Sequence, residues 1–121
     1  MRRKKARCFV YASASTHEGQ QDTRNQVHDC HEYARKLGLR VTDVITVEVS
    51  SQKSRKTRTL DDLFNQMHIN DTLITSEISR LGHSTSEIFR VVNEQIKGKI
   101  NLHCIKENFI LLKDDPQLTR L

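Results

Sequence analysis

Runs of apolar residues, several of them rich in β-branched side chains, recur along the chain and predict strands. Residues 7–13 form an apolar run without a turn residue, which is typical of a buried strand. Residues 39–49 are rich in β-branched residues and predict a second strand. The same reasoning predicts a third strand at 71–78, a fourth at 100–105 and a short candidate fifth at 109–112.

Between these runs the spacing of apolar positions changes to about 3.6 residues, which predicts three amphipathic helices. The first helix begins at Asp22 and ends before Gly38, and the second covers residues 59–67. The third begins at Ser84, which has capping-box spacing to Glu87, and ends at Gly98. The apolar stripes are Val27, Cys30, Ala34 and Leu37; Leu60, Leu63, Phe64 and Met67; and Ile88, Val91, Val92 and Ile96.

The remaining segments predict loops, and the order of elements predicts the fold class. Residues 16–21 form a polar loop, and residues 50–58 contain no apolar side chain, which predicts a mobile loop. Strands that alternate with helices indicate a three-layer α/β/α sandwich around a mostly parallel sheet of four to five strands. The length of 121 residues, with no internal repeat or linker, suits a single domain over residues 1–121.

The charge of the chain indicates a polyanionic partner. The net charge is +5 with a pI near 9.3, and the excess is clustered in two basic runs. Aromatic residues make up only 5%, which disfavours a protein that stacks single-stranded bases. A frayed terminus and a solvated loop would explain the same charges, so this alternative stays open. The runs are Arg2, Arg3, Lys4, Lys5 and Arg7, and Lys53, Arg55, Lys56 and Arg58.

Other features exclude several classes of protein. No run reaches the roughly 18 apolar residues of a membrane span, and the basic N-terminus lacks the apolar region of a signal peptide, so a cytoplasmic protein is expected. The three cysteines form no CxxC pair, which favours reduced buried thiols over a disulfide framework. His28, Cys30 and His31 are a weak metal candidate, because such histidines on a polar helix face are usually solvated.

Hydroxyl and arginine side chains fall where a parallel sheet gathers functional residues, beyond the carboxyl ends of its strands. Ser13 and Ser15 follow the first predicted strand, and Arg80 follows the third. Such a set suits phosphoryl transfer, because a guanidinium binds two phosphate oxygens at once and stays charged. Purely structural roles are the alternative: Ser15 could cap a helix, and Arg80 could form a surface ion pair with Glu77 or Asp71.

Two motifs resemble those of the serine recombinases of the resolvase/invertase family. Tyr11-Ala12-Ser13-Ala14-Ser15-Thr16 resembles that family's Tyr-x-Arg-x-Ser-Thr signature. Residues 70–82 are similar to its strand-and-loop motif, in which Arg-Leu-Gly-Arg-Ser is usual, and residues 21–26 and 105–109 also fit invertase-like members. The matches keep their order and cover nearly the whole chain, so the resemblance is specific.

The resemblance implies a mechanism with no metal and no cofactor. Ser15 matches the nucleophile that attacks a phosphate of double-stranded DNA and leaves a 5′-phosphoserine link, and Arg80 matches the phosphate-binding arginine. Arg58 matches the arginine that ends the mobile loop, with Arg55 as the alternative. The resemblance also implies a homodimer and a synaptic tetramer in full-length members. The expected DNA-contacting and supporting residues are Lys53, Arg55, Lys56, Gln26 and either Gln20 or Gln21.

Departures from the family pattern lead to a second hypothesis. Ser13 stands where the family has arginine, and His83 stands for the second arginine of the Arg-Leu-Gly-Arg motif. Loss of two cations should slow catalysis severely. The chain stops at Leu121, where the family's dimerisation helix would begin, and shows no helix-turn-helix pattern. The alternative is therefore a degenerate or truncated recombinase remnant that acts by protein or DNA association. A phosphate-binding module for small substrates is disfavoured, because no Gly-rich loop or Walker lysine is present.

Overall fold

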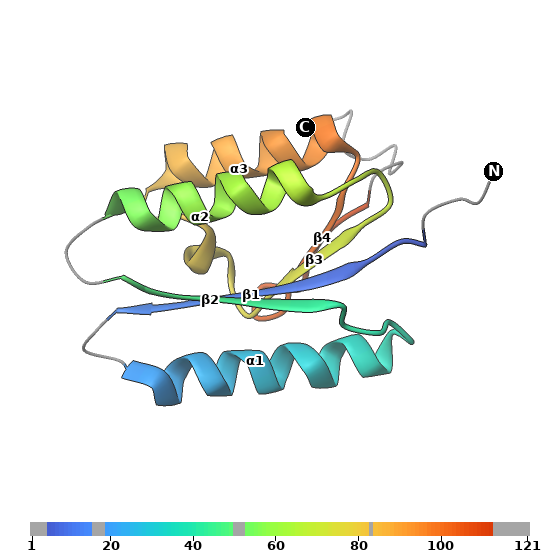
Figure 1. Ribbon diagram of the computed structural model, residues 1–121, viewed down its shortest axis with the longest axis horizontal. Helices are drawn as coiled ribbons and strands as arrows, with labels where there is room; N and C mark the ends of the chain where they lie inside the picture. The colour runs from blue at the N-terminus through green and yellow to red at the C-terminus, as the bar shows by residue number, and fades with distance from the viewer. Residues whose placement is uncertain (1–4, 16–18, 50–52, 83, 113–121) are drawn as a thin grey trace.

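The computed structural model, which describes residues 5–15, 19–49, 53–82 and 84–112, contains one five-stranded sheet of order β2-β1-β3-β4-β5 (Figure 1). The first four strands are parallel, and β5 runs antiparallel to β4. The elements are β1 (Cys8–Ser15), α1 (Gly19–Lys36), β2 (Asp43–Val49), α2 (Lys53–Gln66), β3 (Thr72–Thr75), the 3-10 helix η1 (Ile78–Leu81), α3 (Thr85–Gly98), β4 (Asn101–Cys104) and β5 (Phe109–Leu111).

Helices cover both faces of the sheet. Figure 1 shows α1 on one face and α2 with α3 on the other, which confirms the predicted three-layer α/β/α sandwich. Successive residues of β1 point to opposite faces, so Phe9 and Tyr11 join the core under α2 and α3, while Val10 joins the core under α1. Because both faces are buried, β1 reads in the sequence as one continuous apolar run.

Several predicted boundaries are wrong, and the largest error concerns the basic loop. Helix α2 begins at Lys53, so residues 53–58 are helical instead of forming a mobile loop. A lack of apolar residues does not prevent a helix, and this stretch has no glycine or proline to interrupt one. Strand β1 continues to Ser15, β2 begins only at Asp43, and β3 ends at Thr75, before η1.

The ends of the helices follow the predictions in part. Gly38 has a φ of +73°, as expected of a residue after a helix C-terminus. Ser84 caps α3 by accepting the N–H of Glu87 at 3.2 Å, which confirms the predicted cap. Gly98, however, is the last residue of α3. The left-handed residue that ends this helix is Lys99, with a φ of 53°.

The three cysteines are free and buried, and burial was predicted for Cys8 and Cys104 from their apolar strand runs. Burial raises the pKa of Cys8 to about 11 and those of Cys30 and Cys104 to about 12, so the thiols are unreactive near neutral pH. Cys30 points into the core under α1 while His28 and His31 are exposed. Within the described ranges, no group of three potential ligands could hold a metal ion, and no helix is long and apolar enough to cross a membrane.

A buried histidine lies on the α1 face of β4. The ring of His103 is 7% exposed and makes an edge contact with Tyr33 of α1, whose hydroxyl lies 2.7 Å from His103 Nδ1. Burial lowers the pKa of His103, since the charged imidazolium would lose its hydration. A neutral ring whose Nδ1 accepts from the Tyr33 hydroxyl fits this site.

We predict that stability falls as the pH drops below about 6.5, the ordinary histidine pKa. The folded pKa of His103 is lower than the unfolded one, so the unfolded chain binds more protons. The contribution is complete above the unfolded pKa and is lost as the pH falls through the folded pKa. Urea unfolding between pH 7.5 and 5.5 would measure it. His103→Gln should flatten the dependence, whereas His28→Gln, at an exposed position of α1, should leave it unchanged. An equal slope in both variants would contradict the assignment.

Candidate active site at the carboxyl end of the sheet

The site lies where β1 extends beyond the end of its neighbour β3. Strand β1 has eight residues and β3 has four, and their pairing ends at Tyr11 and Thr75. On its other side β1 stays paired with β2 as far as Ser15, which lies opposite Val49. The last part of β1 therefore presents backbone groups to a space that no strand fills.

Gln26 of α1 occupies that space. Its Oε1 accepts the N–H of Ser13 at 3.2 Å, and its Nε2 donates to the Ser13 carbonyl at 2.8 Å. Both residues are buried, at 4% and 2% exposure. A side-chain amide thus replaces the missing strand, which satisfies a buried peptide group that would otherwise be costly.

Arg80 of η1 also binds Ser13. Its Nη1 donates to the Ser13 carbonyl at 3.1 Å, and the Ser13 hydroxyl donates to the Arg80 carbonyl at 3.3 Å. These reciprocal bonds fix η1 against β1. Gly82, just after η1, allows the close approach of α3, because a Cβ there would lie 2.9 Å from the Glu87 Cβ.

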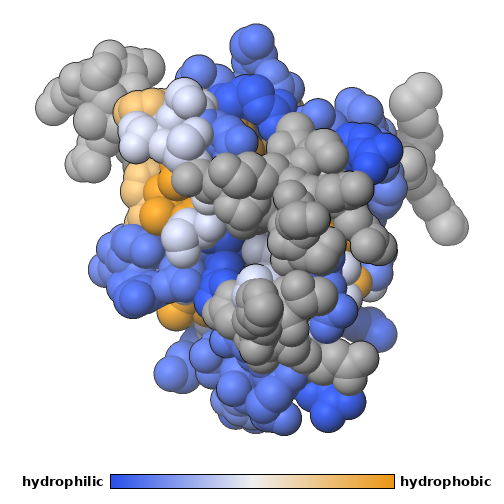
Figure 2. Space-filling model, turned by 90° about the vertical axis from the view of Figure 1, so that its left-hand side faces the viewer, coloured by the Kyte–Doolittle hydropathy of each residue, from blue (hydrophilic) through white to orange (hydrophobic). Residues whose placement is uncertain are grey.

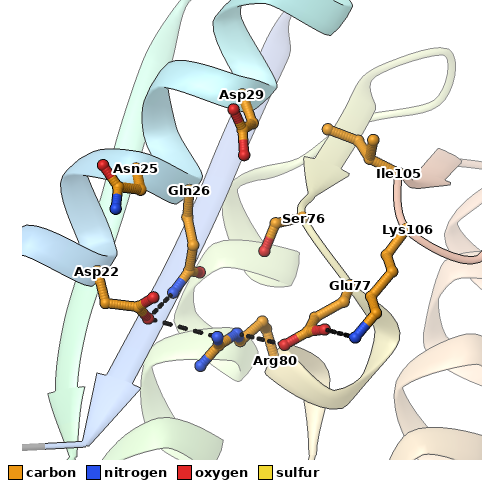
Figure 3. A pocket seen from close by; sticks show the side chains of 9 residues that line it. All are labelled: Asp22, Asn25, Gln26, Asp29, Ser76, Glu77, Arg80, Ile105 and Lys106. Atoms are coloured by element: carbon orange, nitrogen blue, oxygen red, sulfur yellow. Dashed lines mark hydrogen bonds and ion pairs between the residues drawn. The ribbon is translucent and has the colours of Figure 1, made fainter. Parts of the chain in front are cut away.

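Two carboxylates hold the Arg80 guanidinium (Figure 3). Asp22 Oδ2 lies 3.3 Å from Nη2, and Glu77 Oε1 lies 3.1 Å from Nε, so the predicted ion pair with Glu77 is present. The predicted alternative, Asp71, pairs instead with Arg7 at the opposite end of β3. The Arg80 side chain is 18% exposed, which strengthens these pairs relative to fully solvated ones.

Lys106, in the β4–β5 turn, extends this network. Its Nζ lies 3.2 Å from Glu77 Oε2, and its backbone N–H donates to the Ser76 carbonyl at 2.8 Å. Burial alone would raise the pKa of Glu77, but the hydrogen bond from Lys106 and the charges of Arg80 and Lys106 outweigh it and lower the pKa. Glu77 is therefore ionised at neutral pH.

A cavity of about 350 Å³, lined mostly by polar and charged residues, opens beside the network. Figure 3 shows it between α1, the connection from β3 to η1, and the β4–β5 turn, with Arg80 at one end and Asp29 at the other. Its charged lining residues are three acids and two bases. A cavity of this kind can receive a polar or charged group beside Arg80.

The other predicted site residues lie around the same edge of the sheet or outside the described residues. Ser15 is the last residue of β1, two positions beyond Ser13, and so shares its face of the strand. Gln21 is exposed on α1 and bonds Asn25 at 3.2 Å, so it does not join the Ser13 peptide as Gln26 does. His83 lies outside the described residues.

Arg58, predicted as a catalytic arginine, and the three basic residues predicted to contact DNA lie in the first turns of α2 (Figure 1). Because α2 follows β2, and Val49 of β2 lies opposite Ser15, these turns begin at the same edge as the end of β1. Figure 2, which looks at this end of the molecule, shows a mostly hydrophilic described surface with apolar side chains gathered along one side. Arg58 is exposed. The residues are Lys53, Arg55, Lys56 and Arg58.

Sequence reasoning missed Asp22 and Lys106 as partners in the network. Asp22 had a local signal, because it precedes Gln26 by one helical turn and accepts its Nε2 at 2.7 Å. Lys106 had none, since its partner Glu77 lies on another element of the chain.

Comparison with known proteins gives the family of the chain. The family model for the resolvase N-terminal domain matches residues 8–121. The chain belongs to this family. The resemblance found in the sequence motifs is thereby confirmed, and the fold of this resolvase-family chain agrees with those of solved relatives. No curated protein matches the sequence closely enough to add to this result.

Three solved structures share the fold with this resolvase-family chain. The N-terminal catalytic domain of TP901-1 integrase is 21% identical, with a TM-score of 0.70 over 94% of this chain and 86% of that one. A resolvase family site-specific recombinase from Streptococcus pneumoniae is 11% identical, with a TM-score of 0.73 over 96% and 82%. The C-terminal catalytic domain of ISC1926 TnpA, an IS607-like serine recombinase, is 14% identical, with a TM-score of 0.64 over 94% and 74%.

We predict that Gln26→Ala lowers the free energy of unfolding by about 1–3 kcal/mol, because the buried N–H of Ser13 loses its acceptor. Gln21→Ala is the matched control, since it removes an exposed glutamine from the preceding turns of the same helix and should change stability by about 0.5 kcal/mol or less. Urea unfolding followed by circular dichroism would measure both. Equal losses would mean that Gln26 contributes only as a helix residue.

Proposed function

We propose that this chain is the catalytic domain of a serine site-specific recombinase, which cuts and rejoins double-stranded DNA through Ser15. The observation that carries the proposal is the position of Arg80, bonded to the Ser13 carbonyl two residues before Ser15 on the same strand. A phosphate-binding cation beside the strand that ends in a hydroxyl is the minimum set for attack on a phosphodiester. Membership of the resolvase family supports site-specific recombination in general.

The proposed reaction conserves the phosphodiester bond energy. Ser15 Oγ bonds to the phosphorus, the bond from phosphorus to the 3′-oxygen breaks, and the proton lost by Ser15 ends on that oxygen as a free 3′-hydroxyl. Arg80 stabilises the charge on the phosphate oxygens in the transition state. A 3′-hydroxyl from the partner strand then reverses the step, so neither metal nor nucleotide cofactor is needed.

The basic first turns of α2 are proposed as the DNA-binding surface. Lys53, Arg55 and Lys56 lie in the first turn of α2, where the positive end of the helix dipole makes cations unfavourable to the fold, and Arg58 follows in the next turn. Binding of DNA phosphates would neutralise them and release counterions. As in the family, the proposed active form is a homodimer that pairs into a synaptic tetramer on DNA in the cytoplasm.

The test is the formation of a covalent adduct. The chain would be fused to a zinc-finger DNA-binding module and incubated with a nicked duplex that carries two module sites around a central cleavage segment. We predict a 5′-linked protein–DNA adduct on a denaturing gel, lost entirely with Ser15→Ala. Arg80→Ala should slow its formation by about 10²–10³-fold. An adduct that survives Ser15→Ala with unchanged yield would overturn the role of Ser15.

The second candidate function, association without catalysis, is favoured by the state of Ser13. Where the family carries an arginine, this side chain is 2% exposed, and its hydroxyl bonds the Arg80 carbonyl. Position 13 therefore contributes structure and no cation.

Replacement of the missing cations separates the two functions. If the chain is degenerate, His83→Arg and the double variant Ser13→Arg with His83→Arg should create adduct formation that the unaltered fusion lacks. The single variant keeps the test valid if the buried position 13 does not accept arginine, which thermal unfolding would reveal. An unaltered fusion that forms adduct as fast as both variants would exclude the degenerate function.

A further inference from the structure

Arg80 is bound on three sides by groups of the protein itself. Its Nη1 donates to the Ser13 carbonyl, its Nη2 pairs with Asp22 and its Nε pairs with Glu77. The Nη1 hydrogen bond is thus made to a protein oxygen, and the carboxylates of Asp22 and Glu77 lie within ion-pair distance of Nη2 and Nε, where an incoming phosphate would otherwise be held. The residue that the proposed function needs as a phosphate ligand is thus occupied before DNA arrives.

Each of these three partners has a second donor that does not depend on Arg80. The Ser13 carbonyl also accepts from Gln26 Nε2 at 2.8 Å, and Asp22 Oδ2 accepts from the same Nε2 at 2.7 Å. Glu77 has Lys106 Nζ at 3.2 Å. Figure 3 shows this chain of contacts, with Gln26 on one side of Arg80 and Lys106 on the other. Arg80 can therefore leave without stranding a buried acceptor, which is the usual large cost of breaking such a network.

We propose that Asp22 and Glu77 are internal competitors of DNA phosphate for Arg80, so that the guanidinium exchanges from the two carboxylates to a phosphodiester when DNA binds. The inference rests on the proposed function. It implies that the two carboxylates inhibit the phosphate site until DNA binds. Before DNA binds, Gln26 and Lys106 share Ser13, Asp22 and Glu77 with Arg80. After Arg80 has moved to the phosphate, Gln26 and Lys106 are the remaining partners of these three residues.

The energetics favour an exchange over a permanent lock. A phosphodiester offers two oxygens to one guanidinium in the planar geometry that arginine prefers. The competing pairs are only partly buried, with Asp22 at 30% and Glu77 at 20% exposure, so each is worth little compared with a fully desolvated pair. Loss of one competitor should therefore strengthen DNA binding by a modest and measurable factor.

The experiment measures the affinity of the full chain for a 20-base-pair duplex by fluorescence anisotropy at low salt. All proteins carry Ser15→Ala, so no covalent step contributes and the result does not depend on catalysis. Asp22→Asn keeps an oxygen that can accept from Gln26 while it removes the charge, and Glu77→Gln keeps the shape of Glu77. Each should tighten binding by about two- to fivefold. When Arg80→Ala is also present, each change should have only the effect expected from the loss of one negative charge.

The matched control is Asp61→Asn. It makes the same change in net charge, but Asp61 pairs with Arg90 between α2 and α3, away from Arg80. The inference is supported if Asp22→Asn exceeds this control and the excess disappears with Arg80→Ala. It is overturned if Asp22→Asn equals the control, weakens binding as a positioning residue would, or acts equally without Arg80. Failure of the proposed function would appear separately, as absence of the Ser15 adduct in the fusion.

A direct readout uses the chain with an intact Arg80. The ¹H–¹⁵N signal of Arg80 Nε, assigned by its loss in Arg80→Lys, should shift when the duplex is added and should shift toward the same position in Asp22→Asn before DNA is present. A signal that stays unchanged at saturating duplex would show that Arg80 keeps its carboxylates, and the exchange would be excluded.

Discussion

The unequal length of β1 and β3 is the constraint on which the site depends. Pairing between them stops at Tyr11, while β1 continues beside β2, so Ser13 has no strand partner on the β3 side. Buried peptide groups require partners. Gln26 from one helical layer and Arg80 from the connection after β3 supply them, and this requirement draws two distant segments to the end of β1. The gap left beside β1 by the shorter strand β3 is thus where the site forms.

Charge balance is the second organising feature of the site. Two acids, Asp22 and Glu77, alternate with two bases, Arg80 and Lys106, along one line of contacts. The alternation keeps a partly buried set of charges close to neutral, which limits its desolvation cost. The network is therefore stable without a bound anion.

The apolar pattern of the sequence was sufficient for the order of elements but not for their ends. Both faces of β1 and β3 are covered, and continuous apolar runs report this directly. The pattern failed at residues 53–58, which are helical although they contain no apolar residue to mark a helical period. It also failed at the end of α3. The sequence predicted that Gly98 ends the helix, but Lys99 is the residue that adopts the left-handed conformation. Propensity is a weak guide wherever tertiary contacts decide.

The sequence by itself determined the three-layer fold, the family, and the candidates Ser13, Ser15 and Arg80. These depend on the spacing of apolar residues and on short motifs, which are local properties of the chain. Only the tertiary structure decided what Arg80 touches. Its partners come from β1, from α1 and from the segment just before η1, and Lys106 in the β4–β5 turn binds one of them. Such contacts depend on which strand ends first and on which side chain then reaches the exposed peptide. Those are properties of the packed sheet, and no local pattern of residues encodes them.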